Sequence, residues 1–204
     1  MASLLTAAER TRFDTQFAAI REMPPPIRPD QRYRASIEDV GAGGYIRFED
    51  RSYRVTGMNV YERNGARWPE LILFRLDDGT TQHLEWEKED EVSVFVSRET
   101  LSFEQVGLRG KEHLWEISEA GEGTVSYNAK TFRYHEDSAV TFYRDGGSAG
   151  KPFHQYLFSS EDRKVFVGVE EWGDERAGYE HNVILSSYLD PRDIEVLVRG
   201  GTSG

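Results

Sequence analysis

The chain has 204 residues, a net charge of -11 and no cysteine. This length allows one domain or two small ones, and an aromatic content of 12% indicates a folded chain. The acidic charge argues against nucleic acid as a partner, because a surface that binds phosphates must be basic. Without cysteine there is no disulfide, thiolate nucleophile or cysteine-based metal site, and a cytoplasmic location fits.

The charge is unevenly distributed. Residues 1–34 carry a net charge of +2 and the remainder carries -13, so a basic leader precedes an acidic body. Such a body favours cationic ligands or basic peptides as partners. No run of 18 apolar residues is present, so no transmembrane segment is predicted, and the N-terminus does not have the pattern of a secretory signal.

The leader is predicted to form an amphipathic helix that begins at Thr6, because Thr6 and Glu9 have the spacing of a capping box. Prolines 24–26 end this helix and start a stiff linker that reaches residue 34. The helix either packs on the body or docks on a protein partner or a membrane surface. Its narrow apolar face, which includes alanine, disfavours the membrane. The apolar residues that share this face are Leu5, Ala8, Phe13, Phe17 and Ile20, of which Phe13, Phe17 and Ile20 are the candidate docking residues.

From Gly44 onward the pattern alternates as in β-strands, and no long helix is expected after residue 34. The stretch "WPELILFRLDDGTTQHLEW" is a predicted hairpin, since Asp78-Gly79 supplies a tight turn. The second half of the chain behaves in the same way. Its strand-like stretches are "GTVSYNAKTFRYH", "AVTFYRDGG", "FHQYLFSSEDRKVFVGVEEW" and "YEHNVILSSYL".

The two halves are also related by an internal repeat. Residues 44–54 align with residues 123–133 without a gap, and "ELILFRLDDGTTQHLEWEKED" parallels "HQYLFSSEDRKVFVGVEEWGDE". Each copy has about five strands, which are too few to bury both faces of a sheet well. We therefore expect a mainly β fold with two tandem, similar, small antiparallel barrels or half-sandwiches packed together. The predicted parts are the leader (1–34), the first repeat (40–98), a connector (99–122), the second repeat (123–198) and a flexible tail (199–204).

The acidic run "LEWEKEDEVSVF" near the end of the first repeat could be an active site, a cation site or a solvated hairpin end. In the alignment its Glu85-Trp86 pair matches Glu171-Trp172, whereas the other acids of the run do not persist. Alternation places Leu84 and Trp86 on one face of the strand and the glutamates on the other. A solvated hairpin end is favoured over a cation or basic-peptide site and over a catalytic pair. The candidate ligand- or partner-binding residues are Glu85, Trp86, Glu87, Glu89, Glu171 and Trp172.

The repeat, with the sequences "RSYRVTG", "ELILF", "LEW" and the closing "DPRDIEV", resembles an uncharacterised bacterial family, domain of unknown function 4178. The resemblance spans about residues 40–198 and implies a fold, but no catalytic residues. Genes of this family often lie beside those for a phage-shock-type coat protein, small membrane proteins and a spermidine-synthase-like enzyme. The resemblance therefore implies a role in an envelope-stress or polyamine-linked system.

Three functions remain open. The first is a non-enzymatic adaptor or scaffold that presents an acidic, aromatic surface to a protein partner, either in the cytoplasm or at the inner face of the membrane. The second is a binding protein for a small cationic ligand such as a polyamine. The third is a hydrolase that uses carboxylates of the rim. No catalytic residue, metal or cofactor is predicted, because the five histidines lack metal-ligand spacing. A cavity between the repeats would favour the second and third functions over the first.

Overall fold

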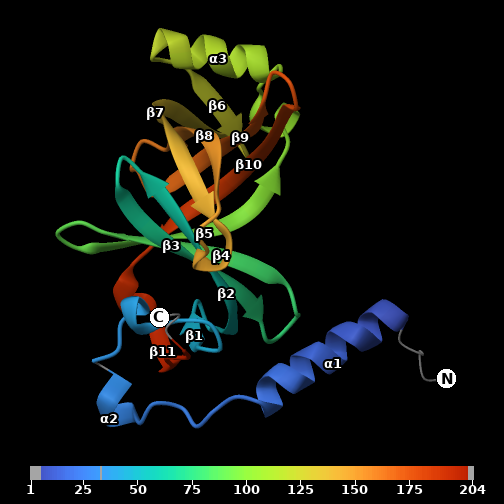
Figure 1. Ribbon diagram of the computed structural model, residues 1–204, viewed down its shortest axis with the longest axis vertical. Coiled ribbons are helices and arrows are strands. Elements are labelled where there is room, and N and C mark those ends of the chain that lie inside the picture. Colours follow the sequence, from blue (N-terminus) through green and yellow to red (C-terminus); the bar gives the residue numbers. More distant parts are fainter. Residues whose placement is uncertain (1–5, 33, 202–204) are drawn as a thin grey trace.

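The computed structural model describes residues 6–32 and 34–201, and its main feature is one large antiparallel sheet (Figure 1). Strands make up 51% and helices 21% of the structure, so the predicted mainly β fold with an N-terminal helix is confirmed. The strands are β1 (Tyr45–Phe48), β2 (Arg51–Arg63), β3 (Ala66–Arg75), β4 (Thr81–Lys88), β5 (Val92–Leu101), β6 (Thr124–Tyr127), β7 (Lys130–Tyr143), β8 (Gly150–Ser159), β9 (Val165–Asp174), β10 (Gly178–Leu189) and β11 (Glu195–Val198).

The α-helices lie at the two ends of the molecule, whereas the 3-10 helix between β7 and β8 lies beside β2 (Figure 1). The leader forms α1, which begins with the predicted capping box between Thr6 and Glu9. The α-helices are α1 (Ala7–Arg21), α2 (Pro29–Arg32) and α3 (Lys111–Ala120), and the 3-10 helices are η1 (Ile37–Asp39), η2 (Glu104–Val106), η3 (Arg144–Gly146) and η4 (Pro191–Asp193).

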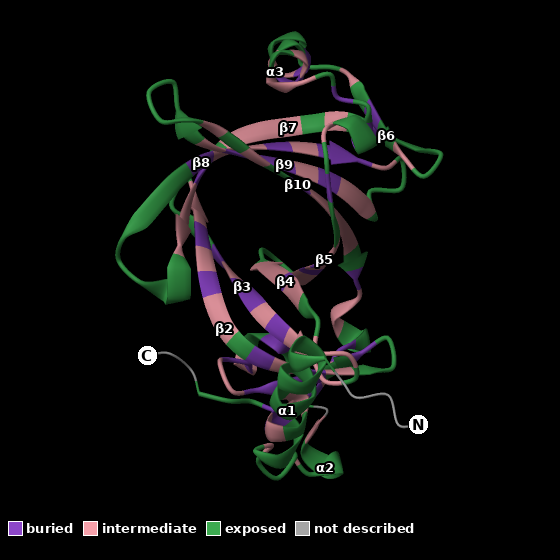
Figure 2. Cartoon of the chain, turned by 90° about the vertical axis from the view of Figure 1, so that its right-hand side faces the viewer, coloured by how far each residue is buried: buried purple, intermediate pink, exposed green. Residues whose placement is uncertain are grey.

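The hydrogen bonding of the sheet closes on itself in a ring. The order is β11-β1-β2-β3-β4-β5-β10-β9-β8-β7-β6, and an additional pairing joins β2 to β7. Three residue pairs make this junction: Val60 with Tyr143, Tyr61 with Phe142 and Glu62 with Thr141. The strands from β2 to β7 in this order therefore surround a common interior, which Figure 2 shows nearly end-on.

The backbone repeats the duplication that the sequence predicts. Strands β1 and β2 meet in a turn at Glu49 and Asp50, and β6 and β7 meet in a turn at Asn128 and Ala129. All four turn residues have φ between 48° and 59°, the conformation of a type I′ hairpin turn. The two halves do not close separately. They join edge to edge, through β5 with β10 and through β2 with β7, into one sheet.

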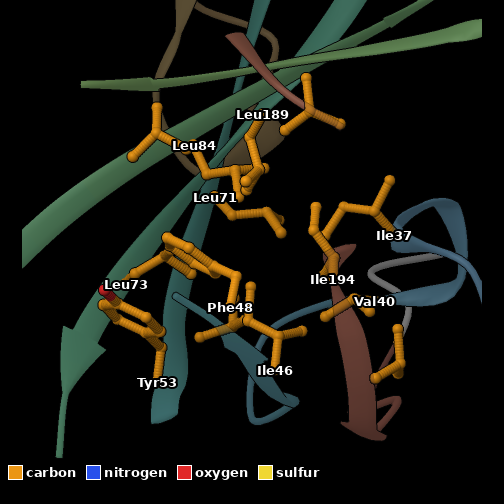
Figure 3. Close-up of a cluster of buried hydrophobic side chains, with 14 residues drawn as sticks. Ile37, Val40, Ile46, Phe48, Tyr53, Leu71, Leu73, Leu84, Leu189 and Ile194 are labelled. Atoms are coloured by element: carbon orange, nitrogen blue, oxygen red, sulfur yellow. The ribbon is translucent and has the colours of Figure 1, made fainter. Parts of the chain in front are cut away.

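Each half keeps its own hydrophobic core on the outside of the ring. Figure 3 shows the first core, where Leu71, Leu73 and Leu84 from β3 and β4 pack against Phe48 and Ile194. In the second core, Tyr156 and Phe158 of β8 and Val167 and Val169 of β9 pack under Leu114 of α3. A third cluster lies where β2 and β7 meet and contains Tyr61, Trp68, Val140 and Phe153.

Two elements differ from the predicted organisation. The ten-residue helix α3 was not expected, although its flanking Gly110 and Gly121 and its buried Leu114 and Ile117 are a helix signal. It packs on the second core and is therefore more than a connector. Strand β11, from the end of the second repeat, pairs with β1 in the first half. The predicted tail lies partly outside the described residues, which end at 201.

Candidate functional site

Because side chains alternate along each strand, apolar core residues point to the outer side of the ring and the residues between them point to its interior. On β3, Leu71 and Leu73 enter the first core, so the alternate residues Trp68, Glu70 and Ile72 face the interior. On β9, Val167 and Val169 enter the second core, so Glu170 faces the interior. The interior of the ring is consequently polar and aromatic, while the two apolar cores lie outside it.

Two cavities occupy this interior and have walls from both halves of the chain. Their volumes are about 480 Å³ and 290 Å³, and Glu170 and Ile184 line both. The larger cavity is lined by Asn59, Tyr61, Glu70, Ile72, His83, Ser97, Thr100, Phe142, Arg144, Asp145, Glu170, Trp172, Asn182 and Ile184. The smaller is lined by Arg63, Trp68, Glu85, Glu87, Phe95, His135, Glu136, Gln155, Leu157, Arg163, Phe166, Gly168, Glu170, Ile184 and Ser186. We call the two cavities together the lumen.

Among the glutamates of the lumen, Glu70 has three side-chain partners. Its carboxylate accepts hydrogen bonds from Asn59 Nδ2 at 2.7 Å and Tyr61 OH at 3.3 Å, and it lies 2.9 Å from His83 Nδ1. The hydrogen bond to Glu70 raises the pKa of His83, because it stabilises the protonated imidazole. Only 6% of Glu70 is exposed, so its charge is held by these neighbours instead of by water.

Two further glutamates line the lumen, Glu85 beside Glu70 on the adjacent strand β4 and Glu170 on β9 of the other half, and each has a tryptophan donor. Trp68 Nε1 donates to Glu85 at 3.0 Å, and Trp172 Nε1 donates to Glu170 at 3.0 Å. Glu170 also accepts from Asn182 Nδ2 at 3.2 Å. These donors are neutral and bring no positive charge, although the charge of His83 lowers the pKa of Glu170 in part.

Burial and mutual repulsion disfavour ionisation of these glutamates. Burial, and after it the charges of Glu70 and Glu170, raise the pKa of Glu85 to about 8, although the hydrogen bond from Trp68 opposes the shift. Burial also raises the pKa of Glu170, to which Glu70 adds, although hydrogen bonds from Asn182 and Trp172 oppose the shift. The pKa of Glu87 is raised mainly by burial. A cation in the lumen would relieve this repulsion.

Acids outnumber bases on the lumen wall. Six carboxylates line the two cavities, against three arginines and two histidines. One arginine, Arg63, is already bound to Glu136 at 2.7 Å and lies over the ring of Trp68 at 5.8 Å. Lys151 similarly lies over Trp172, 4.7 Å from the ring centroid. The tryptophans at the lumen therefore already accept cationic groups of the chain itself.

The candidate binding residues of the acidic run, which are neighbours in sequence, lie in different parts of the structure. Glu85 and Glu87 line the smaller cavity, whereas Glu89 lies in the exposed turn between β4 and β5. Trp86 points the other way and packs against the first core, where its Nε1 has no hydrogen-bond partner among the described residues. The prediction that the glutamates and Trp86 lie on opposite faces is thus correct, but Glu85 is half-buried and lines the interior of the ring.

The alignment of Glu85-Trp86 with Glu171-Trp172 is wrong by one residue. Trp172 faces the lumen, whereas Trp86 faces a core. Glu171 lies on the outer side of β9, where it accepts hydrogen bonds from Trp115 Nε1 at 3.0 Å and Tyr156 OH at 3.3 Å and contacts His181 Nε2 at 2.9 Å. It fastens α3 to the sheet. In the second repeat, the glutamate that faces the lumen as Glu85 does is Glu170.

Sequence reasoning did not identify several residues of the lumen, among them Asn59, Trp68, Glu70, Glu170 and Asn182. A signal for them exists: each alternates with the core residues of its own strand. A polar residue at such a position normally faces water, so alternation alone does not indicate an enclosed site. The predicted docking residues lie elsewhere, on α1, and Leu5 of that face is outside the described residues.

The fold and the lumen define a duplicated, mainly β protein whose ring-bonded sheet encloses a polar, carboxylate-rich interior. The chain belongs to the family described as Domain of unknown function (DUF4178), whose model matches residues 41–191. No curated protein and no solved structure matches the chain. Within the described residues, no helix is long and apolar enough to cross a membrane.

Proposed function

We propose that the protein binds a small cationic ligand in the lumen of the ring. The observation that carries this proposal is the group of Glu70, Glu85 and Glu170, which line a shared interior in which the charge of Glu70 raises the pKa of both Glu85 and Glu170. A positive ligand group would compensate these charges at a site where Glu70 and Glu170 are buried. Coulomb attraction is stronger in such a site than at an exposed surface.

The aromatic residues support the same ligand class. Tyr61, Phe142 and Trp172 line the larger cavity, and Trp68, Phe95 and Phe166 line the smaller one. Aromatic faces attract ammonium and guanidinium groups, and they pack against the aliphatic parts of such molecules. A linear polyamine is one ligand of this class and serves as a probe.

An adaptor requires an exposed surface that is both acidic and aromatic. Trp86 is directed into a core and Trp172 into the lumen, so neither supports that function. A hydrolase requires carboxylates placed beside a reacting group. Glu70, Glu85 and Glu170 each accept hydrogen bonds from neighbouring side chains, which supports a binding role over a catalytic one.

The proposal is tested by calorimetric titration of the full chain with spermidine at about 150 mM salt, where surface attraction is screened over about 8 Å. We expect saturable binding that survives this salt concentration and strengthens between pH 6 and pH 8, as Glu85 begins to lose its proton. The double variant Glu85→Gln, Glu170→Gln should bind at least about tenfold more weakly, a change of about 1.4 kcal/mol.

The matched control removes three charges from the exposed turn instead, as Glu89→Gln, Asp90→Asn and Glu91→Gln. It should bind spermidine like the wild type, because these exposed side chains line neither cavity of the lumen. A neutral chain of similar length, triethylene glycol, should not bind. Binding that disappears at 150 mM salt, or that responds to the turn variant and not to the lumen variant, would refute the proposal.

A further inference from the structure

Strand β7 has an edge that its neighbours cover only in part. On one side it pairs with β8 from residue 133 to residue 143. On the other side it pairs with β6 at residues 130–133 and with β2 at residues 141–143. Between these two ladders, residues 135–139 have no strand beside them among the described residues. We call this stretch the free edge of β7.

The peptide groups on the free edge have no partners within the described chain. Tyr134 donates its N–H to the oxygen of Gly123, which ends the ladder with β6. Beyond that bond, the N–H and C=O groups of residues 135–139 that point away from β8 bond to no described residue. His135 and Ala139 are exposed, so solvent reaches the edge. A row of unpaired backbone groups is a template on which a further strand can pair.

The free edge borders the smaller cavity of the lumen. Glu136 of β7 lines that cavity together with Glu87, which comes from β4 in the other half. Burial raises the pKa of Glu87, the charge of Arg63 lowers it and the charge of Glu136 raises it, so these groups lie within range of one another. Arg63 is also bound to Glu136 at 2.7 Å. The chain thus already holds one basic side chain of its own beside the free edge.

We propose that the free edge binds an extended basic peptide as an added strand, and that a lysine or arginine of this peptide enters the smaller cavity. The proposal rests on the proposed function, because it makes that side chain the cationic ligand of the lumen. Side chains alternate along a strand, so a strand on this edge directs every second side chain to the interior of the ring. In this mode of recognition the backbone hydrogen bonds supply affinity and the alternate side chains supply specificity.

Charge selects a basic peptide over a second copy of the chain. The smaller cavity is lined by four carboxylates, against two arginines and one histidine. One of these arginines, Arg63, is already paired with Glu136. Each copy of the chain has a net charge of -11, so two copies that paired edge to edge would bring like charges together. A peptide with basic residues at alternate positions brings the opposite charge to the cavity.

The first test is calorimetric titration of the full chain with a blocked seven-residue peptide in which lysine and valine alternate, at about 150 mM salt. We expect saturable binding. A peptide with glutamine in place of every lysine should bind at least about tenfold more weakly, because it brings no charge to the cavity. The variant Glu87→Gln should weaken binding of the lysine peptide by at least about tenfold as well. The matched variant Glu89→Gln, whose side chain lines neither cavity of the lumen, should bind it like the wild type.

Two further peptides distinguish an added strand from a peptide held by charge alone. Each carries N-methyl groups on one of the two alternating sets of backbone nitrogens, so each keeps its charge and loses one set of donors. Only one set faces β7, because N–H groups alternate between the two sides of a strand. We expect one methylated peptide to bind at least about tenfold more weakly than the parent, and the other to bind nearly as well as the parent.

Amide hydrogen exchange locates the bound peptide. The peptide should slow exchange of the free amides within residues 135–139 by at least about tenfold, whereas spermidine should not slow it. Equal affinities of the two methylated peptides, or binding without this protection, overturns the proposal. A chain that binds spermidine and not the peptide refutes this proposal alone, and a chain that binds neither refutes the proposed function with it. Protection that needs no peptide and grows with protein concentration would assign the edge to a second copy and would also overturn the proposal.

Discussion

At the scale of single residues, the glutamates of the lumen are the most unusual feature of the protein. Glu70 and Glu85 are direct partners across the β3–β4 ladder. Like charges placed opposite each other destabilise a sheet pair. Trp68, Asn59 and Tyr61 supply hydrogen bonds that offset part of this cost. A site that retains such a cost is poised for a ligand of opposite charge, because binding removes the repulsion.

The raised pKa of Glu85 predicts how stability depends on pH. The pKa is about 8 in the folded chain against an ordinary value of 4.5, so between these values the folded state binds more protons than the unfolded state. Stability therefore falls as pH rises through this window. We expect Glu85→Gln, which still accepts from Trp68, to match the wild type near pH 4.5. Near pH 8.5 it should be more stable by about 1–3 kcal/mol.

Urea denaturation at several pH values measures this difference. The control Glu89→Gln, in the exposed turn, should stay within about 0.5 kcal/mol of the wild type at every pH. If Glu85→Gln shows the same stability difference at pH 4.5 and at pH 8.5, burial does not disfavour ionisation of this side chain, and our account of the lumen fails.

At the scale of elements, the two equivalent hairpin turns show how differently sequences can encode one backbone. The β6–β7 turn places Asn128 and Ala129 at positive φ, and Ala129 has a φ of 59°. Asparagine tolerates this region, whereas alanine is strained there by about 1–2 kcal/mol. The first repeat uses Glu49 and Asp50 in the corresponding turn. The flanking strands pair in the same way in both hairpins, and this pairing stabilises the turns in spite of their different residues.

This strain predicts that Ala129→Gly stabilises the protein by roughly 0.5–1 kcal/mol, because the relief of strain exceeds the added entropy of the unfolded chain. The same chemical change at the exposed end of α3, Ala120→Gly, should destabilise it by about 0.5–1 kcal/mol, since Ala120 has helical geometry. Thermal denaturation compares the two variants. Destabilisation by both would show that the turn does not impose the left-handed conformation.

At the scale of the whole molecule, one shared sheet couples two separate cores. Seven residue pairs join β5 to β10, and three join β2 to β7. Strand β11 adds a further link, because it follows the second half in sequence but pairs with β1 of the first. Neither half can open its edges without exposing strand hydrogen bonds of the other.

We therefore predict that the halves unfold together. Leu73→Ala in the first core and Phe158→Ala in the second should each lower the free energy of unfolding by about 2–5 kcal/mol. Each should move one calorimetric transition without splitting it, with equal calorimetric and van't Hoff enthalpies. The appearance of a second transition in either variant would mean that the halves are independent units in spite of the shared sheet.

The sequence alone determined the duplication, the strand content and the position of the leader helix, because alternation, turn residues and a capping box are local signals. It also predicted that Glu85 and Trp86 lie on opposite faces of their strand. It did not determine which face of each strand is exposed to solvent. The ring closes through contacts between Val60–Glu62 and Thr141–Tyr143, which are about 80 residues apart, and no local pattern encodes such a pairing.

Tertiary structure thus decided the site. Closure of the ring turned the polar faces of β3, β4 and β9 inward, so that Glu70, Glu85 and Glu170 line an enclosed lumen in place of a solvated rim. It also decided that α1 attaches through Ala19 and leaves Phe13, Phe17 and Ile20 exposed. The physical reason is the same in both cases. A periodic pattern specifies which residues share a face, but only the packing of distant elements specifies what that face meets.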